Sequence, residues 1–200
     1  IEVGVAYKDG VFSPAAATTI NGSITDANNY MRLTVAAGQR HSGVAGTGVI
    51  VDGAAMVTGH LFHIRDAAFR MEWLEMRNYP GDTTTGQVIN VEEAEAPGTY
   101  LSHLLIHDYT DFIRGAINIY DDTTVRNSIL YNGPNGIRTF GNDNPQVTLE
   151  NVTIYGMTGD GVRAQAAGTY FINNTVSVGG GDQDFDLDDA GVVIDASSGY

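Results

Sequence analysis

Acidic residues are most closely spaced near the end of the sequence, where Asp182, Asp184, Asp186 and Asp188 alternate with other residues. Carboxylate oxygens are the ligands that Ca²⁺ prefers, so alternating aspartates of this kind could hold calcium. Their spacing is neither that of an EF-hand loop nor that of a nine-residue calcium-binding repeat. A solvated acidic loop has the same composition. We therefore predict a solvated loop and no cofactor, with calcium binding as the alternative.

Two arginines, Arg138 and Arg163, occupy the same place in the similar segments NGIRTF (135–140) and DGVRAQ (160–165). The guanidinium group is a planar fork that binds carboxylates in a bidentate manner. Two arginines stacked on an outer surface could therefore hold an acidic sugar or the carboxylates of a neighbouring subunit. Salt bridges to aspartates or glutamates of the same chain are the alternative.

Few other residues are arranged for catalysis. The chain has no Cys, and no Lys follows Lys8, which excludes thiol chemistry and, beyond that position, a lysine base. His60 and His63 lack a third metal ligand in the sequence pattern. No nucleophile elbow, phosphate-binding loop or dinucleotide-binding motif is present. We therefore predict no catalytic residue.

Five segments with a common pattern run through the middle and end of the chain. They read MEWLEMR (71–77), LSHLLIH (101–107), VRNSILY (125–131), LENVTIY (149–155) and FINNTVS (171–177). The first, fourth and sixth positions are mostly apolar, and the third is Asn127, Asn151 and Asn173 in the last three segments. This pattern predicts two short strands with a sharp bend at the third position. Asn tolerates the left-handed backbone of such a bend, and stacked Asn side chains can form a hydrogen-bonded ladder.

A second motif lies between these segments and predicts a third strand in each repeat. Its clearest members are RGAINI (114–119), NGIRTF, DGVRAQ and AGVVID (190–195), with weaker members at 86–91 and 59–64. The motif is aligned on Leu61, Val88, Ile117, Ile137, Val162 and Val192, which are about 26 residues apart on average. Several short strands repeated at this period indicate a β-solenoid. We predict an all-β fold of about seven coils, regular over 59–200, with an irregular N-terminal strand and opening coils over 1–58.

Over residues 59–195 these motifs resemble the right-handed parallel β-helix repeat family, the fold shared by pectate-lyase-like enzymes and phage tailspikes. The segment LTVAAGQRHSGVAGTGVIVDG (33–53) looks like the early coils of such proteins. The resemblance implies a right-handed parallel β-helix. It implies little about activity, because the fold occurs in enzymes, adhesins and structural proteins.

The strand alternation also predicts an outward-facing stripe. It consists of residues at the fifth and seventh positions of the repeat: Leu105, Ile129, His107, Tyr131 and Tyr155. A large exposed apolar patch marks a partner surface, and Tyr side chains also stack on sugar rings. The alternative is that a loop, either 79–86 or 93–99, covers the stripe.

Charge and hydropathy narrow the classes of partner. The net charge of −14 predicts no nucleic-acid partner, because phosphates would be repelled. No apolar run is long enough for a membrane helix. The chain begins at Ile1, so we expect a processed chain or a piece of a larger one.

We predict a non-enzymatic structural or interaction protein. It would be an extracellular surface, filament or virion component that self-associates through its coil ends and an exposed flank into a homo-oligomer or polymer. The alternative is a polysaccharide lyase or hydrolase, or a carbohydrate-binding module.

Overall fold

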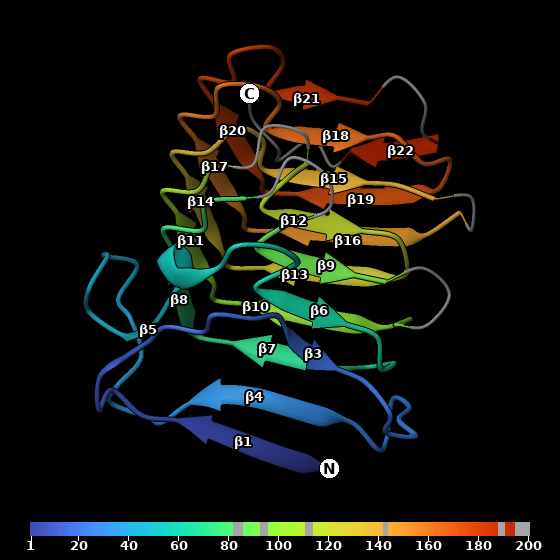
Figure 1. The fold of residues 1–200 in the computed structure, drawn as a ribbon. Helices are drawn as coiled ribbons and strands as arrows, with labels where there is room; N and C mark the ends of the chain where they lie inside the picture. Colours follow the sequence, from blue (N-terminus) through green and yellow to red (C-terminus); the bar gives the residue numbers. More distant parts are fainter. Residues whose placement is uncertain (82–85, 93–95, 111–113, 142–143, 188–190, 195–200) are drawn as a thin grey trace.

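The structure, a computed structural model, describes residues 1–200 except 82–85, 93–95, 111–113, 142–143, 188–190 and 195–200. The chain winds as about seven coils, about 25 residues apart, and each coil gives one short strand to each of three parallel sheets (Figure 1). A short 3-10 turn, η1 (Gly53–Ala55), is the one helical element in the described residues. The predicted all-β parallel β-helix is thereby confirmed.

The three sheets are named here A, B and C. Sheet A contains β1 (Glu2–Ala6), β4 (Met31–Val35), β7 (Arg70–Glu72), β10 (Thr99–Ser102), β13 (Thr123–Arg126), β16 (Gln146–Glu150), β19 (Thr169–Asn173) and β22 (Gly191–Ile194). Sheet B contains β2 (Val11–Phe12), β5 (Val49–Asp52), β8 (Leu74–Arg77), β11 (Leu105–His107), β14 (Ile129–Tyr131), β17 (Thr153–Tyr155) and β20 (Val176–Val178). Sheet C contains β3 (Thr18–Ile20), β6 (Phe62–Ile64), β9 (Ile89–Val91), β12 (Ile117–Ile119), β15 (Ile137–Thr139), β18 (Val162–Ala164) and β21 (Phe185–Asp186).

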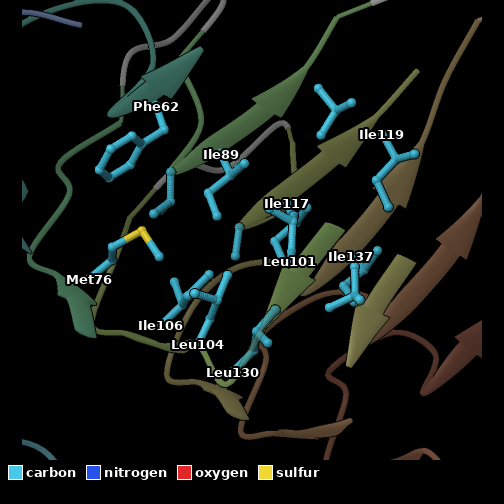
Figure 2. Close-up of a cluster of buried hydrophobic side chains, with 14 of the residues drawn as sticks. Phe62, Met76, Ile89, Leu101, Leu104, Ile106, Ile117, Ile119, Leu130 and Ile137 are labelled. Carbon is cyan, nitrogen blue, oxygen red and sulfur yellow. The ribbon is translucent and has the colours of Figure 1, made fainter. Parts of the chain in front are cut away.

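The apolar core fills the space enclosed by the three sheets. Figure 2 shows Leu101 of sheet A, Ile106 of sheet B and Ile117 of sheet C pointing toward one another. All three are fully buried, and they belong to one continuous cluster that runs along the solenoid. The first, fourth and sixth positions of the repeat thus point inward, as the alternation predicts.

The bend between sheets A and B lies at the third position of the repeat, as predicted. The residues there have a left-handed backbone, with φ between 44° and 67°, and they are Trp73, His103, Asn127, Asn151 and Asn174. The predicted ladder is present: the Asn151 side-chain amide donates to Asn127 Oδ1 at 3.0 Å, and that of Asn174 donates to Asn151 Oδ1 at 2.6 Å. We refer to these five residues as the bend column.

The turns into sheet C pack closely because glycines lie there. A Cβ atom added to Gly136 would lie 2.3 Å from the carbonyl oxygen of Gly161 in the next coil. One added to Gly115 would lie 2.5 Å from the carbonyl oxygen of Gly136. Gly115 and Gly136 therefore leave the space that the coils need to stack at these turns.

The sequence alignment is wrong by one residue in its last segment. Leu149 pairs with Ile172 rather than Phe171, so the bend falls at Asn174 and not at Asn173. The segment FINNTVS has two adjacent apolar residues followed by two adjacent Asn, so the pattern alone fits two frames. Packing selects the frame that buries Ile172, which is fully buried, and leaves Phe171 half-buried.

The second motif needs similar corrections. The paired residues of sheet C are Phe62 and Ile89 rather than Leu61 and Val88, although all four side chains are buried. The neighbours Leu61 and Phe62 both reach the core because the chain bends there, and the same holds for Val88 and Ile89. The segment 190–195 does not extend sheet C, because β22 pairs with β19 in sheet A, and Phe185 of β21 takes the predicted position of Val192.

Residues 1–58 supply β1 to β5, which continue the same three sheets. The carboxylate of buried Asp66 accepts hydrogen bonds from the backbone amides of Gly22 and Ser23. This contact holds the first coil against the second. The segment between β4 and β5, residues 36–48, contains no strand and is called the strap below.

Candidate functional site: the outer face of sheet B

The outer face of sheet B carries two rows of side chains that the strand register aligns. One row is Glu75, Leu105, Ile129, Thr153 and Val176, and the other is Arg77, His107, Tyr131, Tyr155 and Val178. The predicted stripe is therefore contiguous, and it ends at Val176 and Val178 because of the frame correction above.

The strap covers the part of this face that lies on the third to fifth coils. The His41 ring donates from Nε2 to the backbone oxygen of His103 at 2.7 Å. The backbone amide of Gly46 donates to Glu75 Oε2 at 2.7 Å, and Gly43 lies against the side chain of Ile129. The strap thus packs on three successive coils that lie well after it in the sequence.

The predicted exposure of the stripe is wrong for two of its residues. Leu105 is fully buried and His107 is 3% exposed, whereas Ile129 and Tyr131 are half-buried and Tyr155 is exposed. Among the described residues, the strap makes contacts across this face. The loops 79–86 and 93–99, which were the predicted alternatives, lie partly outside the described residues.

A group of charged side chains lies at the border of the strap. The buried carboxylate of Glu75 faces Nε2 of His107 at 3.2 Å, and Nδ1 of His107 faces the exposed Asp108 carboxylate at 2.8 Å. Beside them, Arg77 Nε binds Asp52 at 3.0 Å. Both ring nitrogens of His107 therefore face carboxylate oxygens. The hydrogen bond from His107 is the main reason that the pKa of Asp108 lies below its usual value.

This arrangement does not fit the acid–base chemistry of a glycoside hydrolase. Such an enzyme places two carboxyl groups on either side of an accessible sugar bond. Here one carboxylate, Glu75, is completely buried and already accepts bonds from Gly46 and His107. The charges hold the strap and the third and fourth coils together.

The aromatic members of the stripe stack on one another. The rings of His107 and Tyr131 are 4.8 Å apart and tilted by 5°, and those of Tyr131 and Tyr155 are 4.9 Å apart and tilted by 4°. Both faces of the Tyr131 ring are therefore covered, and Tyr155 is followed in the row by Val178. A sugar stacks on an open ring face, so this ladder offers ring edges rather than sugar platforms.

The bend column borders the strap on the other side, a relation that the sequence pattern does not reveal. Trp73 stacks on His103 with the ring centres 3.9 Å apart, and the guanidinium of Arg40 lies 4.7 Å from the Trp73 ring centre. A hollow of about 280 Å³ lies between this column and the strap. Burial is the main reason that the pKa values of His41 and His103 lie below the usual value for histidine.

The two predicted arginines are neighbours on the outer face of sheet C. Arg138 pairs in register with Arg163. Arg163 binds Asp186 at 3.0 Å and Asp160 at 3.2 Å, which is the salt-bridge alternative. Arg138 is buried, donates to Gln165 Oε1 at 2.5 Å and lies over the Phe140 ring. Contact of either arginine with an acidic sugar or another subunit remains a prediction.

The aspartate run is partly engaged within the chain. Asp182 is exposed, Asp184 accepts a hydrogen bond from the Gly180 amide at 2.9 Å, and Asp186 binds Arg163. Asp188 lies outside the described residues. Within the described part of the chain, no group of three or more His, Asp or Glu side chains is placed to hold a metal ion. Calcium binding remains the alternative prediction.

Among the described residues, no helix is both long and apolar enough to cross a membrane. No protein-family model matches the chain, and neither a curated protein nor a solved structure was found to be similar to it.

Proposed function

We propose that the protein is a non-enzymatic structural component that associates with further copies of itself, end to end, through its coil ends. The observation that carries this proposal is the repeat itself. Within the described residues, successive coils add their strands to the same three sheets, so the first and last described coils present edges of the same sheets. Free strand edges of this kind pair with other strands. A head-to-tail contact of matching ends generates a filament rather than a closed dimer.

The edge of β1 illustrates how a second copy would bind. The Glu2 amide donates to the Tyr30 oxygen, and the Ala6 oxygen accepts from Ala36, so these residues point toward β4. Alternate residues of a parallel strand point to opposite neighbours. The amide and carbonyl groups of Val3 and Val5 therefore point away from β4, along the open side of sheet A.

The interior of the first coils adds a shape argument. An apolar hollow of about 380 Å³ lies there, lined by residues that include Ala6, Phe12, Leu33 and Phe62. The inward positions of the first strand hold Gly4 and Ala6, which are too small to fill it. The last described coil instead carries large apolar side chains, Phe185 and Leu187, at the border of the core. A second copy whose last coil stacked on the first coil of this copy would place Phe185 and Leu187 over the hollow.

The alternative, a polysaccharide-active protein, has less support. The stacked rings of the stripe cover one another, and Glu75 is buried. The location of the proposed component, at a cell surface, in a filament or in a virion, belongs to the same proposal and rests on the fold resemblance.

The test is the size of the assembled protein. We expect the chain of residues 1–200 to form linear oligomers that lengthen with concentration, measured by sedimentation velocity and electron microscopy. Val5→Pro removes a donor from the open edge and leaves the bonds from β1 to β4 intact. It should shift the protein to monomers, whereas Val5→Thr, the matched control, should assemble like the original chain. A protein that stays monomeric at high concentration would refute the proposal.

A further inference from the structure

The strap is held by contacts at both of its ends and at its centre. At its N-terminal end, the Ala36 amide donates to the Ala6 oxygen at 3.0 Å. Near its C-terminal end, the Lys8 ammonium group donates to the backbone oxygens of Gly46 and Thr47 at 3.1 and 3.2 Å. At the same place the Gly46 amide binds the Glu75 carboxylate. At the centre of the strap, Arg40 lies over the Trp73 ring, and the His41 side chain donates a hydrogen bond to the backbone oxygen of His103.

His41 uses both of its ring nitrogens, in opposite roles. Nε2 lies 2.7 Å from the backbone oxygen of His103, which only accepts, so this nitrogen must carry the proton. Nδ1 lies 3.2 Å from the backbone nitrogen of Gly43, which only donates, so this nitrogen must be unprotonated. The geometry thus fits one form of the ring, the neutral Nε2–H tautomer.

Space around His41 is restricted. The side chain is 7% exposed, and a Cβ atom on Gly48 would lie only 2.6 Å from the His41 backbone nitrogen. The ring centre lies 5.9 Å from that of Trp73. A second proton on the ring, at Nδ1, would therefore point at the Gly43 amide.

The charged neighbours of His41 come from each element that packs against it. On the strap, Arg40 lies over the Trp73 ring. On sheet B, the Glu75 carboxylate attracts a proton to His41, while Arg77 and His107 lie beside Glu75. In the bend column, His103 receives the hydrogen bond from His41.

Burial outweighs the attraction of Glu75 and lowers the pKa of His41 below its usual value of 6.5. The pKa of His103 is also lowered, first by burial.

We propose that the strap, residues 36–48, is an acid-released cover, and that a proton on Nδ1 of His41 breaks its contact with Gly43 and lifts the strap from sheet B. The buried residues that it uncovers include Leu105 and Glu75. This proposal does not depend on self-association, because it concerns one chain only.

The direction of the effect follows from the two states of His41. With the strap open, His41 is in water and has its usual pKa of about 6.5. With the strap closed, its pKa is lower, so the open state binds more protons as the pH falls. The closed strap is fully stable above pH 6.5 and weakens below it. One proton favours opening up to tenfold for each pH unit until the pH reaches the pKa of the closed state.

Hydrogen exchange of the strap amides, corrected for the intrinsic pH dependence of exchange, tests the proposal. The amides of Ser42, Gly43 and Gly46 should lose protection by up to tenfold per pH unit below pH 6.5. The fluorescence of Trp73, the single tryptophan of the chain, should change over the same pH range. Protection that is equal at pH 7 and pH 5 would overturn the proposal.

Two variants separate His41 from its neighbour. His41→Gln keeps a donor near the His103 carbonyl but does not titrate, so the loss of protection with acid should disappear. His103→Gln, the matched control, should keep it, because the backbone oxygen that His41 binds is still present. The same acid response in His41→Gln as in the original chain would contradict the proposal. If the strap of His41→Gln is open at every pH, an NMR titration of the His41 ring in the original chain is the deciding measurement. A pKa below 6.5 supports the proposal, and a pKa at or above 6.5 overturns it.

Discussion

The substitution Gly136→Ala should destabilise the solenoid strongly, because it adds one methyl group where two coils touch. The new Cβ atom would lie 2.3 Å from the Gly161 oxygen and 3.0 Å from Cγ2 of Ile154. The first contact is with backbone, so it cannot be relieved by turning a flexible side chain. Gly136 N donates to the Asp160 oxygen at 3.0 Å, and Ile137 N donates to the Gly161 oxygen at 2.9 Å. Moving the coils apart to admit the methyl group would therefore stretch these hydrogen bonds.

Overpacking of a tight core costs about 1–3 kcal/mol, and we expect about 3 kcal/mol here because backbone must move. In a chain of this size that corresponds to a fall in Tm on the order of 6–12 °C. Thermal unfolding followed by circular dichroism measures it. The matched control is Gly10→Ala, since no atom lies within 4 Å of the added Cβ there. Equal Tm values for the two variants would refute the argument that glycine is required for coil stacking.

Three further predictions concern the bends, the first coil and the assembly. Asn151→Ala should lower the free energy of unfolding by about 1–2 kcal/mol, because it removes a rung of the ladder and places Ala in a left-handed backbone conformation. Asn151→Gly should lower it less, because Gly adopts that conformation without strain, and denaturant unfolding compares the two variants. Asp66→Ala should cost about 2 kcal/mol by leaving the Gly22 and Ser23 amides unpaired, whereas Asp66→Asn, which keeps an acceptor, should cost less; faster exchange of these two amides would accompany the loss. Self-association should strengthen as salt is raised from low to physiological concentration, because copies with a net charge of −14 repel one another, and sedimentation that shows the reverse would contradict this.

The fold could be predicted because a solenoid repeats the same local problem in every coil. Inward apolar residues recur at the same positions of successive coils, and Asn recurs at left-handed bends, so both are visible in the sequence. The exact frame is less visible where like residues are adjacent, as at Phe171–Ile172 and Asn173–Asn174. Either frame satisfies the pattern there, and only the packing of the neighbouring coil distinguishes them.

The cover over sheet B could not be predicted from the repeat. Alternation predicts which side of a strand a residue lies on, but outward is not the same as exposed. Leu105 points outward and is still fully buried, because a segment more than fifty residues earlier in the chain lies over it. The contact between His41 and His103 is equally non-local, and the strap has no periodicity that would place it.

The departures from the repeat nevertheless mark where the strap lies. In the bend column, the fifth to seventh coils have Asn, whereas the third and fourth have Trp73 and His103. In the row that begins at Glu75, the later coils have Leu, Ile, Thr and Val. A buried charge is costly unless it is paired, so Glu75 requires the Gly46 amide and His107 above and beside it. Polar or aromatic residues that break a solenoid pattern in successive coils therefore indicate that a segment from elsewhere in the chain packs on those coils, and in this protein that segment is the strap.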